Sequence, residues 1–321
     1  MKLRALAIFG ILTAWLLPSI CAPAKSQTYP AREVRLITES IGSSADYLAR
    51  YIGEQLSRKW NFPIAIDNQG GRSALLVAKS APDGYTLLMG STGSMATAPS
   101  MSKTPDYDPV RDFSPIALVS KSPLLVVARP SVPAATLREF IEYARKSVER
   151  LRYSSGGIGT AAHLTTAYLA SAAGIETVHV PYKGAAAGLK ALLAGETHYA
   201  AISASTVVPH VRTNSLRAYA VTTTERYPVF PEIPTASESG LAGFEATAWY
   251  GLLAPAATPP TIVSKINTDV VSILRQPEVT AAFLKQGAIG APGTAEEFGA
   301  WIRNETFKWA KAVRAAGINP E

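Results

Sequence analysis

Three short loops contain most of the residues with which this sequence could bind a small anion. They span residues 40–46, 90–94 and 154–160, and serine, threonine and glycine dominate them. Each loop follows an apolar run typical of a strand and precedes a helical pattern, which is where ligands bind in open α/β sheets. The first turn of a helix exposes unpaired N–H groups that accept carboxylate or phosphate. Helix caps and turns use the same residue types, but the recurrence in three loops favours binding.

Backbone donors and hydroxyl groups make up most of the candidate binding set. Glycine lets the backbone approach a ligand closely, and serine and threonine add neutral hydrogen bonds. The candidates in the three loops are Ser40, Gly42, Ser43, Ser44, Asp46, Ser91, Thr92, Ser155, Gly157, Gly159 and Thr160.

Three titratable side chains outside these loops extend the set. Arg72 follows two glycines, and its planar guanidinium suits a bidentate contact with a carboxylate. Lys183 follows a strand-like run and precedes small residues, so its charge could lie above a cleft. His163 falls in the first turn of a predicted helix, where it could contact a ligand or pack against the protein. For Arg72 and Lys183 the alternative is an ordinary solvated surface position.

The sequence lacks the common patterns of metal, dinucleotide and hydrolase sites. It has one cysteine, Cys21, and its four histidines form no H-x-x-x-H or H-x-H pair. Residues 157–162 fit G-x-G-x-x-A, but Glu176 precedes the next strand instead of following it, which argues against a dinucleotide. No G-x-S-x-G occurs. We expect no catalytic residue, metal or cofactor, with a secreted hydrolase or lyase that uses His163 as an alternative.

Composition favours a folded, exported protein that binds small molecules. The chain has 321 residues, of which 47% are apolar and 17% charged, enough for two domains with real cores. Its formal net charge is +7, yet no basic run or basic–aromatic stripe occurs, so we do not expect nucleic-acid binding.

The first 26 residues have the pattern of a secretory signal peptide. Lys2 and Arg4 precede an uncharged apolar segment, residues 5–20, and small residues follow it. A lipoprotein attached through Cys21 is disfavoured, because a bulky isoleucine precedes that cysteine. We therefore assign residues 1–26 to the signal peptide, with cleavage after Ala24 or Ser26, and predict that the mature protein is periplasmic.

Two successive α/β units and a helical tail are predicted for the rest of the chain. They imply two lobes with a cleft between them, and crossings near residues 121–123 and 249–255. Lobe 1 is assigned to residues 27–121 and 255–321, and lobe 2 to residues 122–254. The predicted strands are 34–38, 63–67, 85–89, 116–119, 124–129, 151–154, 177–181, 199–202 and 216–221, with an extended segment at 246–254, and the predicted helices are 45–58, 73–80, 137–149, 161–173, 186–193, 209–212, 260–275 and 296–316.

Five stretches carry a resemblance to a known family. They are residues 81–88 (APDGYTLL), 107–116 (YDPVRDFSPI), 155–164, 178–184 (VHVPYKG) and 249–255 (WYGLLAP). Over essentially the whole mature chain, the sequence resembles the Bug-type (TctC-like) extracytoplasmic solute-binding proteins of tripartite tricarboxylate transporters. The resemblance implies an α/β, two-lobed type II periplasmic-binding-protein fold, with two mostly parallel sheets flanked by helices and hinged by two crossing strands. It also implies that the lobes close around a small carboxylate and deliver it to a membrane permease.

The sequence departs from the family pattern in three places. Residues 38–46 (TESIGSSAD) replace a loop that usually reads like P-F-x-P-G-G-G-x-D, and the loop at residues 69–72 is shortened. Ser203 and Ser205 stand where many members have an acidic or amide side chain, and we add both to the candidate set. The loss of an acid there argues against a ligand with an amino group.

These observations predict a periplasmic, monomeric solute-binding protein for a di- or tricarboxylate or an aromatic acid. The resemblance implies that its partners are the permease subunits of a tripartite tricarboxylate transporter. A receptor that reports its ligand to a sensor protein is the alternative within the same fold.

Overall fold

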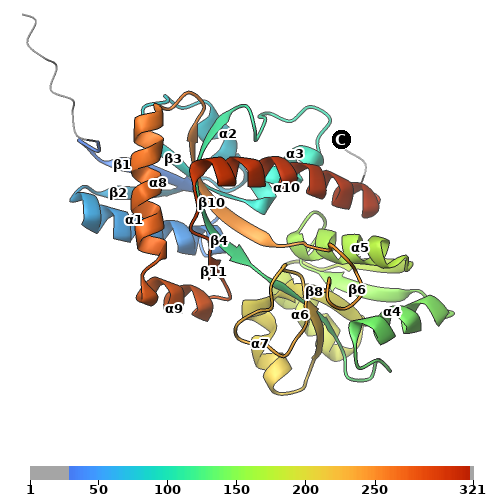
Figure 1. Ribbon diagram of the computed structural model, residues 1–321. Coiled ribbons are helices and arrows are strands. Elements are labelled where there is room, and N and C mark those ends of the chain that lie inside the picture. Colours follow the sequence, from blue (N-terminus) through green and yellow to red (C-terminus); the bar gives the residue numbers. More distant parts are fainter. Residues whose placement is uncertain (1–28, 319–321) are drawn as a thin grey trace, which may run out of the picture.

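The computed structural model describes residues 29–318, and the chain folds there into two lobes, each built on its own sheet (Figure 1). The predicted signal peptide, residues 1–26, lies outside the described residues. None of the helices in the described part of the chain is both long and apolar enough to cross a membrane.

The sheet of lobe 1 has the strand order β11-β4-β10-β3-β1-β2. β1 (Val34–Thr38) pairs in parallel with β2 and β3, whereas β10 runs antiparallel to β3 and β4. The remaining strands of this sheet are β2 (Ile64–Asn68), β3 (Thr86–Ser91), β4 (Phe113–Ser122), β10 (Ala248–Pro255) and β11 (Ile289–Gly290).

The sheet of lobe 2 has the strand order β7-β6-β8-β5-β9. β6 is parallel to β7 and β8, and β5 is antiparallel to β8 and β9. Both sheets are therefore mixed, where we predicted mostly parallel pairing. The antiparallel pairs involve strands that enter a sheet without a crossover helix, and such strands need not run parallel to their neighbours. The bounds are β5 (Leu124–Ala128), β6 (Leu151–Ser155), β7 (Thr177–Pro181), β8 (Tyr199–Ser203) and β9 (Arg217–Val221).

Helices cover both faces of each sheet. In lobe 1, Leu48 of α1 and Ile266 of α8 belong to one buried cluster, while Val77 of α2 and Phe298 of α10 belong to another. In lobe 2, Phe140 of α4 and Leu164 of α5 share a core, and α6 and α7 pack on a separate one. The helices are α1 (Ser44–Trp60), α2 (Ser73–Ala78), α3 (Ala98–Ser100), α4 (Leu137–Lys146), α5 (Ala161–Ala173), α6 (Ala185–Ala194), α7 (Ala204–Arg212), α8 (Pro260–Leu274), α9 (Pro277–Lys285) and α10 (Ala295–Ala315), with short helical turns η1 (Gly70–Arg72) and η2 (Gly93–Thr97).

Before α10, the chain passes between the lobes twice. It leaves lobe 1 at Pro123, the single residue between β4 and β5, and it returns before β10. Residues 249–255, where we predicted the return crossing, lie within β10 and pair with β3 and β4 of lobe 1. The predicted boundary at residue 254 thus falls near the end of this strand.

The last helix, α10, belongs to both lobes (Figure 1). Its start is fixed by a capping box between Thr294 and Glu297. Phe298 packs in a core of lobe 1, whereas Trp309 packs against lobe 2. Between them, the buried carboxylate of Glu305 accepts hydrogen bonds from the indole N–H groups of Trp249 (2.8 Å) and Trp309 (2.7 Å).

Candidate ligand-binding cleft

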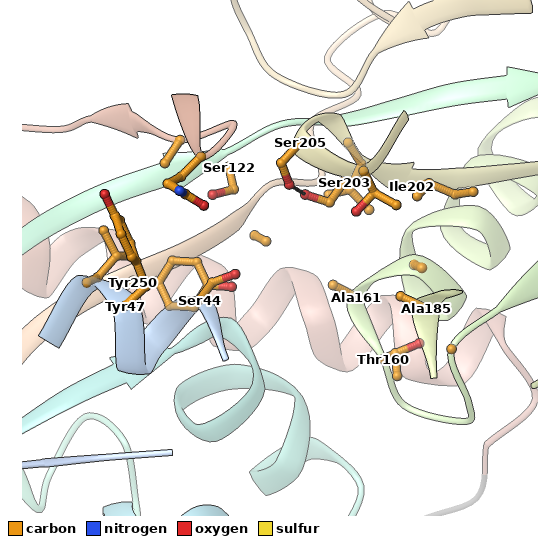
Figure 2. A pocket seen from close by; sticks show the side chains of 18 of the residues that line it. Ser44, Tyr47, Ser122, Thr160, Ala161, Ala185, Ile202, Ser203, Ser205 and Tyr250 are labelled. Atoms are coloured by element: carbon orange, nitrogen blue, oxygen red, sulfur yellow. Dashed lines mark hydrogen bonds between the residues drawn. The ribbon is translucent and has the colours of Figure 1, made fainter. Parts of the chain in front are cut away.

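A cavity of about 410 Å³ lies between the two lobes. Figure 2 shows Ser44, Tyr47 and Tyr250 on one side of it, opposite Thr160 and Ala185. Its lobe-1 wall consists of Ser44, Tyr47, Leu48, Ser122, Ala248, Tyr250, Gln286 and Ala288, and its lobe-2 wall consists of Leu124, Gly156, Thr160, Ala161, Ala162, Gly184, Ala185, Ile202, Ser203, Ser205 and Thr206.

The lobe-2 wall is built around the first turns of three helices. α5 starts after Thr160, whose side-chain oxygen accepts the backbone N–H of His163 (3.3 Å) and donates to the carbonyl of Gly157 (2.8 Å). The cap thus turns the loop sharply and leaves the backbone N–H groups of Ala161 and Ala162, which line the cavity, without an intrahelical acceptor.

The starts of α5 and α6 lie side by side because of glycine. A Cβ on Gly156 would lie 2.9 Å from the backbone nitrogen of Ala185, so a larger residue would separate the two loops. Gly184 precedes α6 with a φ of +96°, a conformation that favours glycine, and no side chain caps this helix. The first-turn N–H groups of α6 are therefore open to a ligand.

The start of α7 completes this wall and touches the crossing between the lobes. The backbone N–H of Ala204 donates to the carbonyl of Pro123 (3.0 Å), and the hydroxyls of Ser203 and Ser205 lie 3.1 Å apart (Figure 2). None of the three helices has an acidic residue in its first turn. The partial positive charges of three helix starts are thus uncompensated at this wall.

The lobe-1 wall combines one helix start with two aromatic rings. Ser43 caps α1 by accepting the backbone N–H of Asp46 (3.1 Å), and Ser44 then begins the helix at the edge of the cavity. Tyr47 of α1 and Tyr250 of β10 contribute their rings to the same wall. Removal of the Tyr250 phenol from water raises its pKa, so the group stays neutral.

No residue of either wall carries a formal charge. A carboxylate in this cavity would be held by backbone N–H groups and hydroxyls, with apolar contacts for the rest of the ligand. This arrangement avoids the desolvation of a cationic side chain, which can cancel the gain from a buried ion pair.

His163 and His179 lie behind the lobe-2 wall and support its loop. The rings stack with centroids 3.7 Å apart, and His163 Nδ1 accepts the backbone N–H of Gly159 (3.1 Å). Ser155 Oγ lies 2.6 Å from His179 Nε2 and also bonds the backbone of Gly157. Burial lowers the pKa of His163 to about 4, with a further contribution from His179. Both residues therefore position the loop instead of lining the cavity.

The structure brings four of the sequence-predicted residues to the cavity walls: Ser44, Thr160, Ser203 and Ser205. Others hold the loops behind them. Asp46 accepts the backbone N–H of Gly42 (2.9 Å) and pairs with Arg50, and Thr92 Oγ1 accepts the backbone N–H of Trp249 (2.7 Å). The remaining predicted residues lie outside the walls. Ser40, Gly42, Arg72 and Lys183 are exposed, and Ser43, Ser91, Ser155, Gly157, Gly159 and His163 lie in the supporting loops or in the strand and helix ends beside them.

Sequence reasoning missed the side chains that give the cavity its apolar surface. Tyr47 and Leu48 follow the first loop by one helical turn, a spacing that could have placed them beside Ser44. Tyr250 lies in the segment 249–255 that carried the family resemblance, but its pattern predicted only a crossing. Ala161 and Ala185 contribute backbone N–H groups, and an alanine side chain does not indicate that its backbone lines a site.

Residues 48–318 match the family described as the Tripartite tricarboxylate transporter family receptor, TctC. The chain belongs to this family. It is 31% identical to Protein BugT of Bordetella pertussis over 98% of both chains. Two solved structures from Rhodopseudomonas palustris are similar to it. Rpa4515 with adipate has a TM-score of 0.76, 32% identity and coverage of 91% of this chain and 100% of that one. MatC (Rpa3494) with bound malate has a TM-score of 0.71, 31% identity and coverage of 89% and 100%.

Membership of the TctC family makes the protein a solute-binding receptor of a tripartite tricarboxylate transporter and not an enzyme, as predicted. Receptors of this family are periplasmic, bind small carboxylates and work with transporter permeases. The predicted periplasmic-binding-protein fold is confirmed.

Proposed function

We propose that this TctC-family receptor captures a small organic carboxylate in the cleft between its lobes and delivers it to a tripartite tricarboxylate permease. A signal peptide at residues 1–26 would direct its export to the periplasm. There it would act as a monomer. The observation that carries the proposal is the meeting of four helix starts, those of α1, α5, α6 and α7, at one uncharged cavity. The adipate and malate bound in two similar structures support the same ligand class.

The proposed contacts divide between direct and supporting residues. Ser44, Ser203 and Ser205 would bind the ligand through their hydroxyls, together with the backbone N–H groups of the first turns of α5 and α6. Thr160 lines the same cavity, but its hydroxyl already donates to Gly157, so it would act by holding the start of α5 in place. The other candidates of the three loops would act by holding those turns in place, as their hydrogen bonds to the backbone suggest.

The two segments in which the chain crosses between the lobes could serve as hinges for closure around a ligand. We propose that lobe 1 comprises β1–β4, β10 and β11 with their helices, and that lobe 2 comprises β5–β9. Closure would then bend the chain at Pro123 and before β10, and a carboxylate between the walls would stabilise the closed state.

Thermal denaturation with a panel of acids tests the proposal. A ligand at about a hundred times its Kd stabilises the folded state by ~2.7 kcal/mol, which raises the Tm by roughly 5 °C or more. We expect at least one di- or tricarboxylate or aromatic acid to produce this shift and to be recovered unchanged. A panel in which only nicotinamide or sugar nucleotides raise the Tm, or in which the acid is turned over, would contradict the proposal.

A matched pair of cap variants tests the site itself. Thr160→Val and Thr136→Val each remove the side-chain cap of a helix, α5 and α4, and each should destabilise the protein by about 1 kcal/mol. Only Thr160 lines the cavity. Calorimetry should show at least tenfold weaker ligand binding for Thr160→Val and unchanged binding for Thr136→Val. Equal affinities in both variants would remove the α5 start from the site.

A further inference from the structure

The two walls of the cleft differ in their electrostatic surroundings. The lobe-2 wall presents three helix starts without an acid in their first turns. The lobe-1 wall presents one helix start, that of α1, whose first turn contains Asp46. A second acid, Glu39, lies in the loop between β1 and α1. The lobe-2 wall therefore attracts an anion more strongly than the lobe-1 wall does.

Glu39 is fixed beside the lobe-1 wall. Its carboxylate accepts a hydrogen bond from the hydroxyl of Ser91, a buried residue at the end of β3. Ser91 is the antiparallel register partner of Tyr250, so the two side chains leave the same face of the sheet, about 5 Å apart at Cβ. The Tyr250 ring lines the cavity. The Glu39 carboxylate consequently lies near this ring, and its charge contributes to raising the pKa of Tyr250.

The two acids differ in how their charges are balanced. Asp46 forms an ion pair with Arg50 (2.9 Å) and accepts hydrogen bonds from Asn68 and from the backbone of Gly42. Glu39 forms no ion pair with any residue in the range 29–318, and its side-chain hydrogen bond is to a neutral hydroxyl. An uncompensated negative charge therefore stands at the lobe-1 end of the cleft.

We propose that this cleft selects acids with a single carboxylate, which binds at the lobe-2 wall, and that Glu39 rejects ligands with a second anionic group at the lobe-1 end. The proposal rests on the proposed function and narrows its ligand class. The far end of the ligand lies against Tyr47, Leu48 and Tyr250, which offer apolar surface and phenol groups.

The physical basis is repulsion between like charges once the lobes have closed around the ligand. A second carboxylate at the lobe-1 wall would lose hydration and approach a like charge that the closed cleft does not screen. Neutral and cationic far ends avoid this cost, and a cationic one gains attraction to Glu39. We expect the charge of Glu39 to make the Kd of a dicarboxylate about tenfold or more higher than that of the matching monocarboxylate.

Calorimetric titration with matched acids tests the selection. We would compare hexanoate and 6-aminohexanoate with adipate, and benzoate with terephthalate, because each set shares a carbon skeleton and differs in the far end. The protein should bind a monocarboxylate of at least one set about tenfold more tightly than the dicarboxylate. Equal affinities, or tighter binding of the dicarboxylates, would overturn the proposal while leaving carboxylate capture intact. If these acids and the wider panel all fail to bind, the proposed function itself falls.

Charge-neutralising variants identify the residue responsible. Glu39→Gln keeps a side chain that can bond Ser91 and should bring the affinity for the dicarboxylate to within about threefold of that for the monocarboxylate. Glu33→Gln is the control, because Glu33 is exposed at the opposite end of β1 and changes the net charge equally. An unchanged preference in Glu39→Gln, or the same loss of preference in both variants, would overturn the role of Glu39.

Discussion

His163 and His179 stack behind the lobe-2 wall, and both imidazoles are held neutral by burial. In the neutral state, His163 Nδ1 accepts the backbone N–H of Gly159 (3.1 Å). A protonated ring would lose this acceptor and would repel its neighbour. The shape of the loop at residues 154–160 thus depends on the protonation state of two side chains that do not line the cavity.

This pair predicts a loss of stability in mild acid. The folded-state pKa of His163 is about 4, below the ordinary value of 6.5, so the unfolded chain takes up the proton first as the pH falls. The stability present at pH 7 should decline between pH 6.5 and pH 4, by about 3 kcal/mol from this residue. Urea unfolding of His163→Gln should show a shallower decline. His210→Gln, a change in α7 outside the stacked pair, should follow the wild type, and identical slopes in all three proteins would contradict the prediction.

At the scale of single residues, the sequence indicated the hydroxyl groups of the cavity but not its apolar side chains. Thr160 and Ser43 were predicted as ligand contacts, with helix capping as the alternative; both cap their helices, and of the two only Thr160 also lines the cavity. The role of Tyr250 depended on the pairing of β10 with β3, which brings segments about 160 positions apart into register. Such pairings are set by the whole fold, and local patterns do not reveal them.

At the scale of elements, the turn between α9 and β11 closes one side of the cleft. Gly287 lies in this turn with a φ of +66°, and a Cβ there would lie 2.5 Å from the backbone nitrogen of Ser205 at the start of α7. Lobe 1 and lobe 2 therefore touch at a point where no side chain fits. Any added atom would have to push α7 away.

Gly287→Ala should consequently weaken ligand binding by at least tenfold, because it separates the lobe-2 wall from the lobe-1 wall. Gly243→Ala is the control, since its φ of +72° imposes a similar backbone strain but nothing lies within 4 Å of the added Cβ. Both variants should lose about 1 kcal/mol of stability. Calorimetry that finds equal affinities in the two variants would show that this contact does not shape the cleft.

The sequence predicted the order of the helices and strands more completely than it predicted how the strands pair. The helix predicted at residues 296–316 is α10 (Ala295–Ala315), and 260–275 is α8 (Pro260–Leu274). The short helix predicted at residues 209–212 is the end of α7 (Ala204–Arg212), because the hydroxyls at its start read as a loop. α9 and β11 went unpredicted; β11 has only two residues, too few to show a period.

At the scale of the whole molecule, a buried ionic cluster joins the lobes. Glu305 of α10 is 2% exposed, accepts the indole N–H groups of Trp249 and Trp309, and forms an ion pair with Lys308. Burial raises the pKa of this carboxyl. Trp249 belongs to β10 of lobe 1, whereas Trp309 packs in the core of lobe 2.

Removal of this carboxylate should therefore destabilise both lobes together. Glu305→Leu leaves two buried indole N–H groups without an acceptor and Lys308 with only its longer ion pair to Glu245 (3.6 Å), at an expected cost of about 3 kcal/mol. Glu296→Leu, at an exposed position of the same helix, should cost less than about 1 kcal/mol. Urea unfolding followed by tryptophan fluorescence measures the difference. Similar midpoints for the two variants would show that the cluster contributes little.

The double attachment of α10 also limits how the cleft can open. Phe298 is buried in lobe 1 and Trp309 in lobe 2. Separating the lobes at this helix would therefore expose the Trp309 indole to water. We therefore expect the cleft to open by a rotation that keeps the contacts of α10, so that the rim farthest from this helix moves most. The permease would then contact a receptor whose cleft opens only on the side away from α10.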